Sequence, residues 1–176
     1  MTTREKFTAQ VTLPSDTEVR VTRSFHAPRM LVWQAHTVPE LMQRWLGHTG
    51  WSMPVCEMDV RVGGKYRWRW CSDENGQAFG FFGTFTEVSE PATLSYDQYY
   101  DPGNFDSAMP LDNPTMIRST YTEKHGITTL VTLMDFGSKE ARDAAISTGM
   151  TDGMEMNYKR LDEVLAVVKN AEPARK

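Results

Sequence analysis

The chain has 176 residues, a net charge of −4 and an apolar content of 40%, which suit a single globular domain with a sizeable core. The acidic balance argues against a nucleic-acid-binding surface. No apolar run reaches the length of a membrane-spanning helix, and the first residues lack the apolar segment of a signal peptide. By default, these observations favour a cytoplasmic protein.

The N-terminal part of the chain predicts a tail followed by a strand. Residues 1–16 are polar and are expected to form a flexible tail, as are residues 169–176 at the other end. A single domain is expected over residues 17–168. Residues 18–27 alternate between two faces, which is typical of a strand. One face of this strand carries Val19, Val21, Arg23 and Phe25.

Two short helices and a series of strands are predicted next. Pro28 and Pro39 favour helix starts, because proline suits the first helical turn. Residues 50–100 alternate as strands between turns, and residues 115–136 predict a hairpin that turns at residues 124–126. The intervening residues 101–114 lack periodicity and are rich in Pro, Gly, Asp and Asn. They predict a long loop, whose residues 104–114 could form a lid.

The last predicted element is one long helix over residues 138–168, capped by Ser138. Its apolar residues recur every three or four positions, which indicates one continuous buried stripe. The order of strand, short helices, six strands and long helix predicts an α+β fold with an antiparallel sheet. Gly149 and Gly153 serve either close packing or the wall of a cavity. The stripe consists of Ile146, Met150, Met154, Tyr158, Leu161, Leu165 and Val168.

The segment KYRWRW at residues 65–70 alternates cations with aromatic rings. In a strand, the three rings share one face and the three cations share the other. Burying such rings is favourable at roughly 25 cal/mol per Å². The aromatic face is therefore expected to look toward the long helix and the cationic face toward water.

The strand before this segment is expected to pair with it through a three-residue loop that contains Gly63-Gly64. That register would set Val62, Val60 and Met58 opposite Tyr66, Trp68 and Trp70, so that apolar residues share one face. On the other face, Asp59 would meet Arg69 and Glu57 would meet Cys71. Cys56 would point inward and Cys71 outward, without a disulfide.

Large rings on a curved sheet beneath one helix rarely close-pack completely, so a pocket is expected, with a filled core as the alternative. The residues predicted to bind a ligand there come from the strands, the second short helix and the long helix. They are Trp45, Tyr66, Trp68, Trp70, Phe79, Phe81, Tyr96, Tyr121, Met150, Met154 and Tyr158.

An ordered set of short motifs resembles the START-like, helix-grip proteins, also called the polyketide-cyclase/aromatic-transport (SRPBCC) superfamily. The chain is most similar to the branch of activator-of-heat-shock-protein-90-ATPase-like proteins, over about residues 17–168. The motifs are Ala27-Pro28, Trp33, Pro39-Glu40, Arg44-Trp45, Gly47, Glu57, Asp59, Gly63-Gly64, Gly153-Met154 and Tyr158 to Leu161.

This resemblance implies a seven-stranded antiparallel sheet wrapped around a long C-terminal helix, with a hydrophobic cavity between them. Relatives in the superfamily bind lipids, hormones or polyketides, some are enzymes, and a eukaryotic branch stimulates a chaperone. The resemblance therefore implies a fold and leaves the function open.

Motifs for metal, phosphate or dinucleotide binding are not found in the sequence, and neither a metal nor a cofactor is expected. The histidines are far apart in sequence. The candidate acid–base groups are Asp97, Glu123, Asp135, Arg118 and His48. The alternative interpretation, given for the carboxylate Glu123, is a solvated charge near the turn at residues 124–126.

Three functions remain open. The first is a binding protein for a small apolar or aromatic molecule. The second is a cyclase-like or hydrolase-like enzyme that acts on such a molecule, which a buried titratable group at the pocket would favour. The third is a chaperone cofactor or other protein-interaction domain, which predicts an exposed apolar patch. A homodimer is compatible with all three.

Overall fold

The structure of the chain is a computed structural model that describes residues 5–47, 49–103 and 113–171. Within these residues, all eight strands form one antiparallel sheet in the order β1-β2-β8-β7-β6-β5-β4-β3. The elements in chain order are β1 (Gln10–Thr12), β2 (Glu18–Phe25), α1 (Arg29–Thr37), α2 (Pro39–Trp45), β3 (Trp51–Met58), β4 (Lys65–Ser72), β5 (Ala78–Ser89), β6 (Thr93–Asp101), β7 (Thr115–Lys124), β8 (Ile127–Asp135), α3 (Lys139–Ser147) and α4 (Met150–Ala171).

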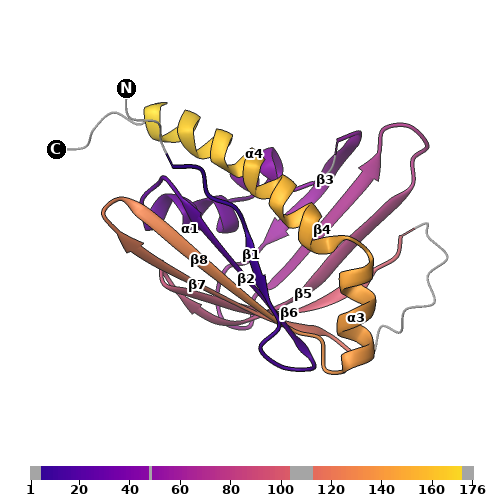
Figure 1. The fold of residues 1–176 in the computed structure, drawn as a ribbon. Helices are drawn as coiled ribbons and strands as arrows, with labels where there is room; N and C mark the ends of the chain where they lie inside the picture. The colour runs from indigo at the N-terminus through magenta and orange to yellow at the C-terminus, as the bar shows by residue number, and fades with distance from the viewer. Residues whose placement is uncertain (1–4, 48, 104–112, 172–176) are drawn as a thin grey trace.

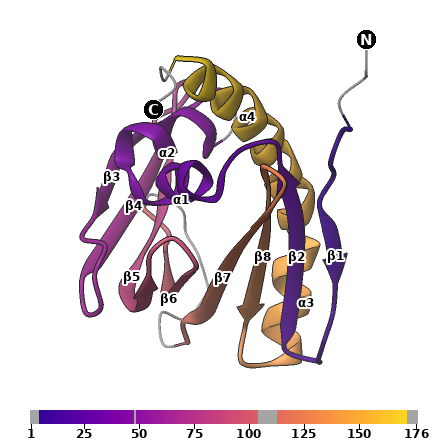
Figure 2. The ribbon, with the colours of Figure 1, turned by 90° about the vertical axis from the view of Figure 1, so that its left-hand side faces the viewer.

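The sheet curves around the last helix, as the resemblance implied. Figure 1 shows α4 crossing the concave side of the sheet. In Figure 2, α1 and α2 lie at one end of the sheet, and both helices pack against α4. The α+β class and the helix-grip arrangement are confirmed. None of the helices in the described part of the chain is long and apolar enough to cross a membrane.

Alternation of buried and exposed side chains places the strand faces as predicted. On β4, Tyr66, Trp68 and Trp70 are buried, while Lys65 and Arg67 are exposed. The hairpin of β7 and β8 turns at His125 and Gly126, both with positive φ, and pairs Lys124 with Ile127. Both predictions are confirmed, because they depend only on local alternation and local turn chemistry.

The sheet has eight strands, not seven, because residues 10–12 pair with β2 at the sheet edge. These residues were expected to belong to the flexible tail. All three side chains of β1 are exposed, so the strand has no buried face. β1 pairs with the open edge of β2 through its backbone. Such pairing needs no alternation of apolar residues, so the sequence pattern does not reveal it.

The register predicted for β3 and β4 is wrong by four residues. Met58 lies opposite Tyr66, Glu57 opposite Arg67 and Cys56 opposite Trp68. Residues 59–64 form a longer loop, in which Val62 is 64% exposed. The predicted faces of both strands are still correct. Side chains alternate with a period of two, so a shift of four residues leaves each side chain on the same face. Both cysteines are free.

The longer loop is held by contacts with β5. Gly63 donates its N–H to the Phe85 carbonyl at 2.8 Å, and the Phe85 N–H donates to the Gly64 carbonyl at 2.9 Å. A Cβ on Gly64 would lie 1.9 Å from the Asp59 carbonyl oxygen, so the loop needs glycine there. Asp59 pairs with Arg61 at 2.7 Å, and Arg69 instead lies 4.0 Å from the Asp101 carboxylate.

The C-terminal segment forms two helices where one continuous helix was predicted. Ser138 caps α3 as expected, its hydroxyl accepting from the Ala141 N–H at 3.1 Å. The chain then breaks at Gly149, whose φ of +81° lies in the left-handed region. Gly149 therefore ends α3, and α4 starts at the next residue. The stripe on α4 is still buried at Tyr158, Leu161 and Leu165.

Arg23 is a buried cation that joins β2 to α4. As predicted, it shares the buried face of β2 with Val19, Val21 and Phe25. Its guanidinium donates to both carboxylate oxygens of Asp162, at 3.0 and 2.6 Å. Glu155 lies 3.5 Å from the same guanidinium. This paired carboxylate–guanidinium geometry compensates for the desolvation of the charge.

Three predictions fall wholly or partly on residues outside the described ranges. They are the greater part of the lid, residues 104–112, the candidate acid–base residue His48, and the ends of the two tails, residues 1–4 and 172–176. Residues 169–171, which were expected to belong to the C-terminal tail, form the end of α4.

Candidate functional site

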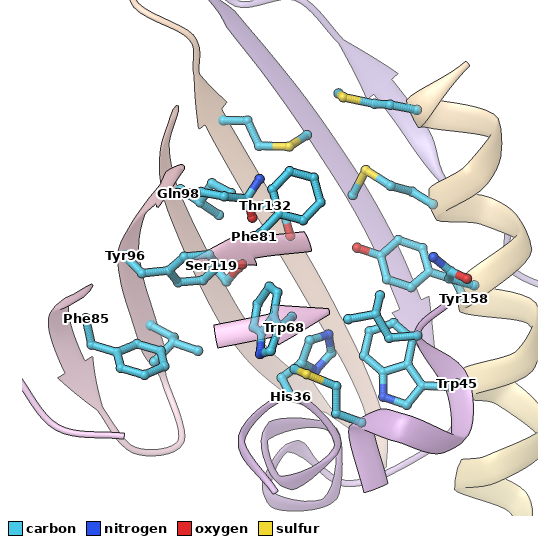
Figure 3. Close-up of a pocket in the computed structure, with 18 of the residues that line it drawn as sticks. His36, Trp45, Trp68, Phe81, Phe85, Tyr96, Gln98, Ser119, Thr132 and Tyr158 are labelled. Carbon is cyan, nitrogen blue, oxygen red and sulfur yellow. The ribbon is translucent and has the colours of Figure 1, made fainter. Parts of the chain in front are cut away.

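A cavity of about 240 Å³ lies between the concave face of the sheet and the helices α1, α2 and α4. Figure 3 shows Trp68 projecting into this space between Tyr96 on one side and Tyr158 on the other. The volume exceeds the roughly 150 Å³ of an engineered apolar cavity that holds benzene. The space can therefore hold a molecule larger than a single ring.

Nine of the eleven predicted residues line this cavity. The sheet contributes the rings on β4, β5, β6 and β7, and the helices contribute the remaining residues. The nine are Trp45, Trp68, Trp70, Phe81, Tyr96, Tyr121, Met150, Met154 and Tyr158. Their expected contact with a ligand stays a prediction, whereas their convergence on one space is a property of the fold.

The other two predicted residues, Tyr66 and Phe79, do not line the cavity and instead support its wall. Tyr66 is buried, and its hydroxyl donates to the Asp97 carbonyl at 2.7 Å. Phe79 stacks on Trp70 with the ring centroids 5.3 Å apart. Sequence alternation places a ring on the inner face, but it does not distinguish a ring at the surface of a cavity from one behind it.

The rings of the wall pack mostly edge to face. Trp68 and Tyr96 have centroids 6.0 Å apart at 78°, and Trp70 and Phe81 have the same separation and angle. Such contacts are favourable beyond simple area burial. They hold the rings in fixed orientations, so the wall is largely pre-formed.

Residues not predicted from the sequence complete the lining. Three of them, Leu94, Gln98 and Ser119, lie two positions from a predicted residue on the same strand, so the same alternation could have found them. These additional residues are His36, Met42, Leu46, Phe85, Leu94, Gln98, Ile117, Ser119, Thr132, Met134 and Asn157.

His36 is the one residue of this lining that titrates near neutral pH in its unperturbed state. Its ring packs against Trp45 and Tyr121, at centroid distances of 4.9 and 5.5 Å. Burial lowers the pKa of His36 to about 4, so the ring is neutral at pH 7. Nδ1 lies 2.8 Å from the Val32 carbonyl, which only accepts, so Nδ1 carries the proton.

Three buried phenols face the same space. Burial raises the pKa of Tyr158 to about 12, although a hydrogen bond with Thr132 partly offsets the effect. Burial also raises the pKa values of Tyr96 and Tyr121. All three hydroxyls therefore remain protonated at physiological pH.

Two polar groups of the lining have no hydrogen-bond partner among the described residues. They are the Tyr121 hydroxyl and the Trp68 Nε1–H. Both side chains are almost fully buried, at 1% and 7% exposure. Buried donors without a partner are uncommon in folded proteins.

The charged candidate residues lie away from the cavity. Glu123 is exposed and accepts from the Arg29 N–H at the start of α1. Asp97 accepts from the Thr84 N–H at 2.8 Å, and Asp135 from the Gly137 N–H at 2.9 Å. Arg118 pairs with Glu87 on the outer face. Of the charged side chains in the described ranges, none lines the cavity.

A metal centre has no basis in the described ranges, where no three His, Cys, Asp or Glu side chains are grouped to hold an ion. The chemistry available inside the cavity is therefore apolar contact and neutral hydrogen bonding.

The comparison with protein families assigns most of the chain to one family. The family described as "Activator of Hsp90 ATPase homolog 1-like protein" matches residues 26–166. The chain belongs to this family. The resemblance drawn from the sequence motifs is thereby confirmed. No curated protein matches the chain.

Solved structures of similar proteins share the fold of this family member over almost its whole length. A Rhodobacter sphaeroides protein is 30% identical, with a TM-score of 0.80, and the match covers 90% of this chain and 98% of that one. A Mycobacterium smegmatis protein is 23% identical, with a TM-score of 0.77 and coverage of 91% and 97%. The AHSA1-like protein of Aeromonas hydrophila is 16% identical, with a TM-score of 0.64 and coverage of 89% and 99%.

Proposed function

We propose that this protein binds a small apolar or aromatic molecule in the cavity between the sheet and α4. The observation that carries the proposal is the lining itself, which is mostly aromatic, aliphatic and methionine side chains, with no charged side chain from the described residues. Pockets of this composition are typical of small-molecule sites. Methionines such as Met150 and Met154 adapt their shape to a ligand.

A neutral fluorescent probe, N-phenyl-1-naphthylamine, tests the proposal. We expect its emission to rise on binding, and small aromatic molecules to displace it. Met154→Trp adds bulk at the cavity lining and should abolish binding, because the added ring occupies the space that the probe needs.

The matched control is Met156→Trp on the same helix, because Met156 is 56% exposed and does not line the cavity. This variant should bind the probe like the unmodified protein. No binding by the unmodified protein, or equal binding by both variants, would overturn the proposed function.

His36 gives specific support to a second candidate, an enzyme that acts on such a molecule. A neutral imidazole with Nδ1 engaged leaves Nε2 as a hydrogen-bond acceptor, which suits a general base. Turnover of a bound ligand by the protein, lost in His36→Asn, would support an enzyme. Ligand binding without any chemical change would favour the binding protein.

A chaperone partner is suggested by the family description, which names activators of the Hsp90 ATPase. A pull-down with the purified chaperone tests this proposal. Binding should then be unaffected by Met154→Trp, because the cavity is internal.

A further inference from the structure

The unpartnered donors in the cavity restrict the chemistry of the ligand. We infer that the ligand is uncharged and carries a hydrogen-bond acceptor, such as a ketone or aldehyde oxygen, that accepts from the Tyr121 hydroxyl or the Trp68 Nε1–H. The inference rests on the proposed function, since it concerns the same cavity.

Several polar atoms of the lining already have partners within the protein. The Trp45 Nε1–H donates to the Ala35 carbonyl at 2.8 Å. The His36 Nδ1–H donates to the Val32 carbonyl at 2.8 Å, and the Asn157 carboxamide oxygen accepts from the Gly47 N–H at 3.2 Å. The protein therefore satisfies these particular atoms itself.

The Tyr121 hydroxyl and the Trp68 Nε1–H differ from these atoms. Within the described ranges, neither the Tyr121 hydroxyl nor the Trp68 Nε1–H has a partner. An indole N–H only donates, so Trp68 can be satisfied only by an acceptor. The Tyr121 hydroxyl keeps its proton, because burial raises its pKa. A ligand with an acceptor oxygen would complete the hydrogen bonding of the cavity wall.

The cavity also disfavours a charged ligand. A carboxylate or phosphate in this space would lose its hydration without gaining a cation, because no Lys or Arg of the described residues lines the cavity. His36 is neutral at pH 7 and cannot replace such a cation. A neutral carbonyl supplies the acceptor without this penalty.

Two ligands of nearly equal shape test the inference. 2-Acetylnaphthalene carries a carbonyl where 2-isopropenylnaphthalene carries a C=CH₂ group, and both are measured by displacement of the fluorescent probe. The quantity compared is the ratio of the two dissociation constants in each protein variant. Comparing this ratio between two protein variants cancels the different hydration of the two ligands, as in a double-mutant cycle.

Tyr121→Phe and Trp68→Phe each remove one unpartnered donor. We expect at least one of these variants to shift the ratio about tenfold against the ketone, which corresponds to the loss of one hydrogen bond. Tyr121→Phe removes no hydrogen bond within the protein, so the variant should fold normally. 2-Naphthoate, which is charged and of similar size, should bind more weakly than the ketone.

Tyr66→Phe is the control for the loss of a phenol hydroxyl, because the Tyr66 hydroxyl donates to Asp97 and lies outside the cavity lining. Its ratio should equal that of the unmodified protein. An unchanged ratio in both Tyr121→Phe and Trp68→Phe, or tighter binding of the naphthoate, would overturn the inference. So would probe binding with no displacement by either naphthalene. In those cases the proposed function would still stand, and only failure of the probe to bind would overturn both.

Discussion

At the scale of single residues, the cavity keeps its ionisable groups neutral. His36 packs between Trp45 and Tyr121, and its pKa falls from 6.5 to about 4, mainly because burial disfavours the charged ring. The buried phenols are also held neutral, with the pKa of Tyr158 raised to about 12. The wall thus offers hydrogen bonds without charge at physiological pH.

The lowered pKa of His36 predicts acid sensitivity of the fold. The unfolded state binds a proton near pH 6.5 and the folded state only near pH 4. The stabilising contribution is therefore fully present above pH 6.5 and is lost as the pH falls toward 4. We expect this residue to reduce the free energy of unfolding by about 2 kcal/mol between pH 7 and pH 5.

Urea unfolding at both pH values measures this effect. His36→Asn cannot titrate in this range and serves as the comparison, because both proteins share all the carboxylates that protonate at low pH. An equal loss of stability in His36→Asn and in the unmodified protein would contradict the prediction.

At the scale of elements, a single glycine decides the shape of the C-terminal segment. Gly149 adopts φ of +81° between α3 and α4. The break allows α4 to start in a new direction, and Met150 and Met154 in its first turns then reach the cavity. Apolar periodicity continues across this position, so the sequence pattern looks like one helix.

Substitution at Gly149 tests the requirement for left-handed backbone. No atom lies within 4 Å of a Cβ built at this residue, so a side chain would meet no steric obstacle. Gly149→Ala should therefore lower the free energy of unfolding by about 1 kcal/mol through backbone strain alone. Gly149→Asn should lower it less, because asparagine tolerates this conformation better. Thermal or urea unfolding of both variants measures the difference, and a larger loss for asparagine would contradict the explanation.

At the scale of the whole molecule, the Arg23 cluster joins the first long strand to the last helix. The Arg23 side chain is 1% exposed and is paired with Asp162, which lies on α4. Glu155, also on α4, accepts from the Ala9 N–H as well. One buried cation therefore links β2 and the segment before β1 to the helix that closes the cavity.

Removing the carboxylate partner should be strongly destabilising. Asp162→Ala would leave the buried Arg23 guanidinium with Glu155, at 3.5 Å, as its one carboxylate partner among the described residues, and should lower the free energy of unfolding by about 3 kcal/mol. The double variant Arg23→Met/Asp162→Leu should recover most of this loss, because apolar side chains need no partner. Urea unfolding measures both changes.

The control for this experiment is the exposed pair of Asp59 and Arg61, whose side chains are 53% and 72% exposed. Asp59→Ala should lower the free energy of unfolding by less than about 1 kcal/mol, because water screens such pairs. Similar losses for Asp59→Ala and Asp162→Ala would show that burial of Arg23 does not decide the effect.

The sequence by itself determined the class of fold, the order of the elements from β2 to β8 and the faces of the strands. These features depend on local rules, namely the period of two along strands and the capping and turn residues at positions such as Ser138 and Gly126. The aromatic wall could be predicted from the sequence for the same reason, since alternation places Trp68 and Trp70 on one face of β4.

Only the tertiary structure decided the register of β3 and β4, the break at Gly149 and the separation of cavity residues from supporting residues. The register depends on the bonds of Phe85 to Gly63 and Gly64, about twenty residues away in sequence. The unpartnered state of the Tyr121 hydroxyl depends on every neighbour around it. Such properties arise from distances between distant segments, which a one-dimensional pattern does not contain.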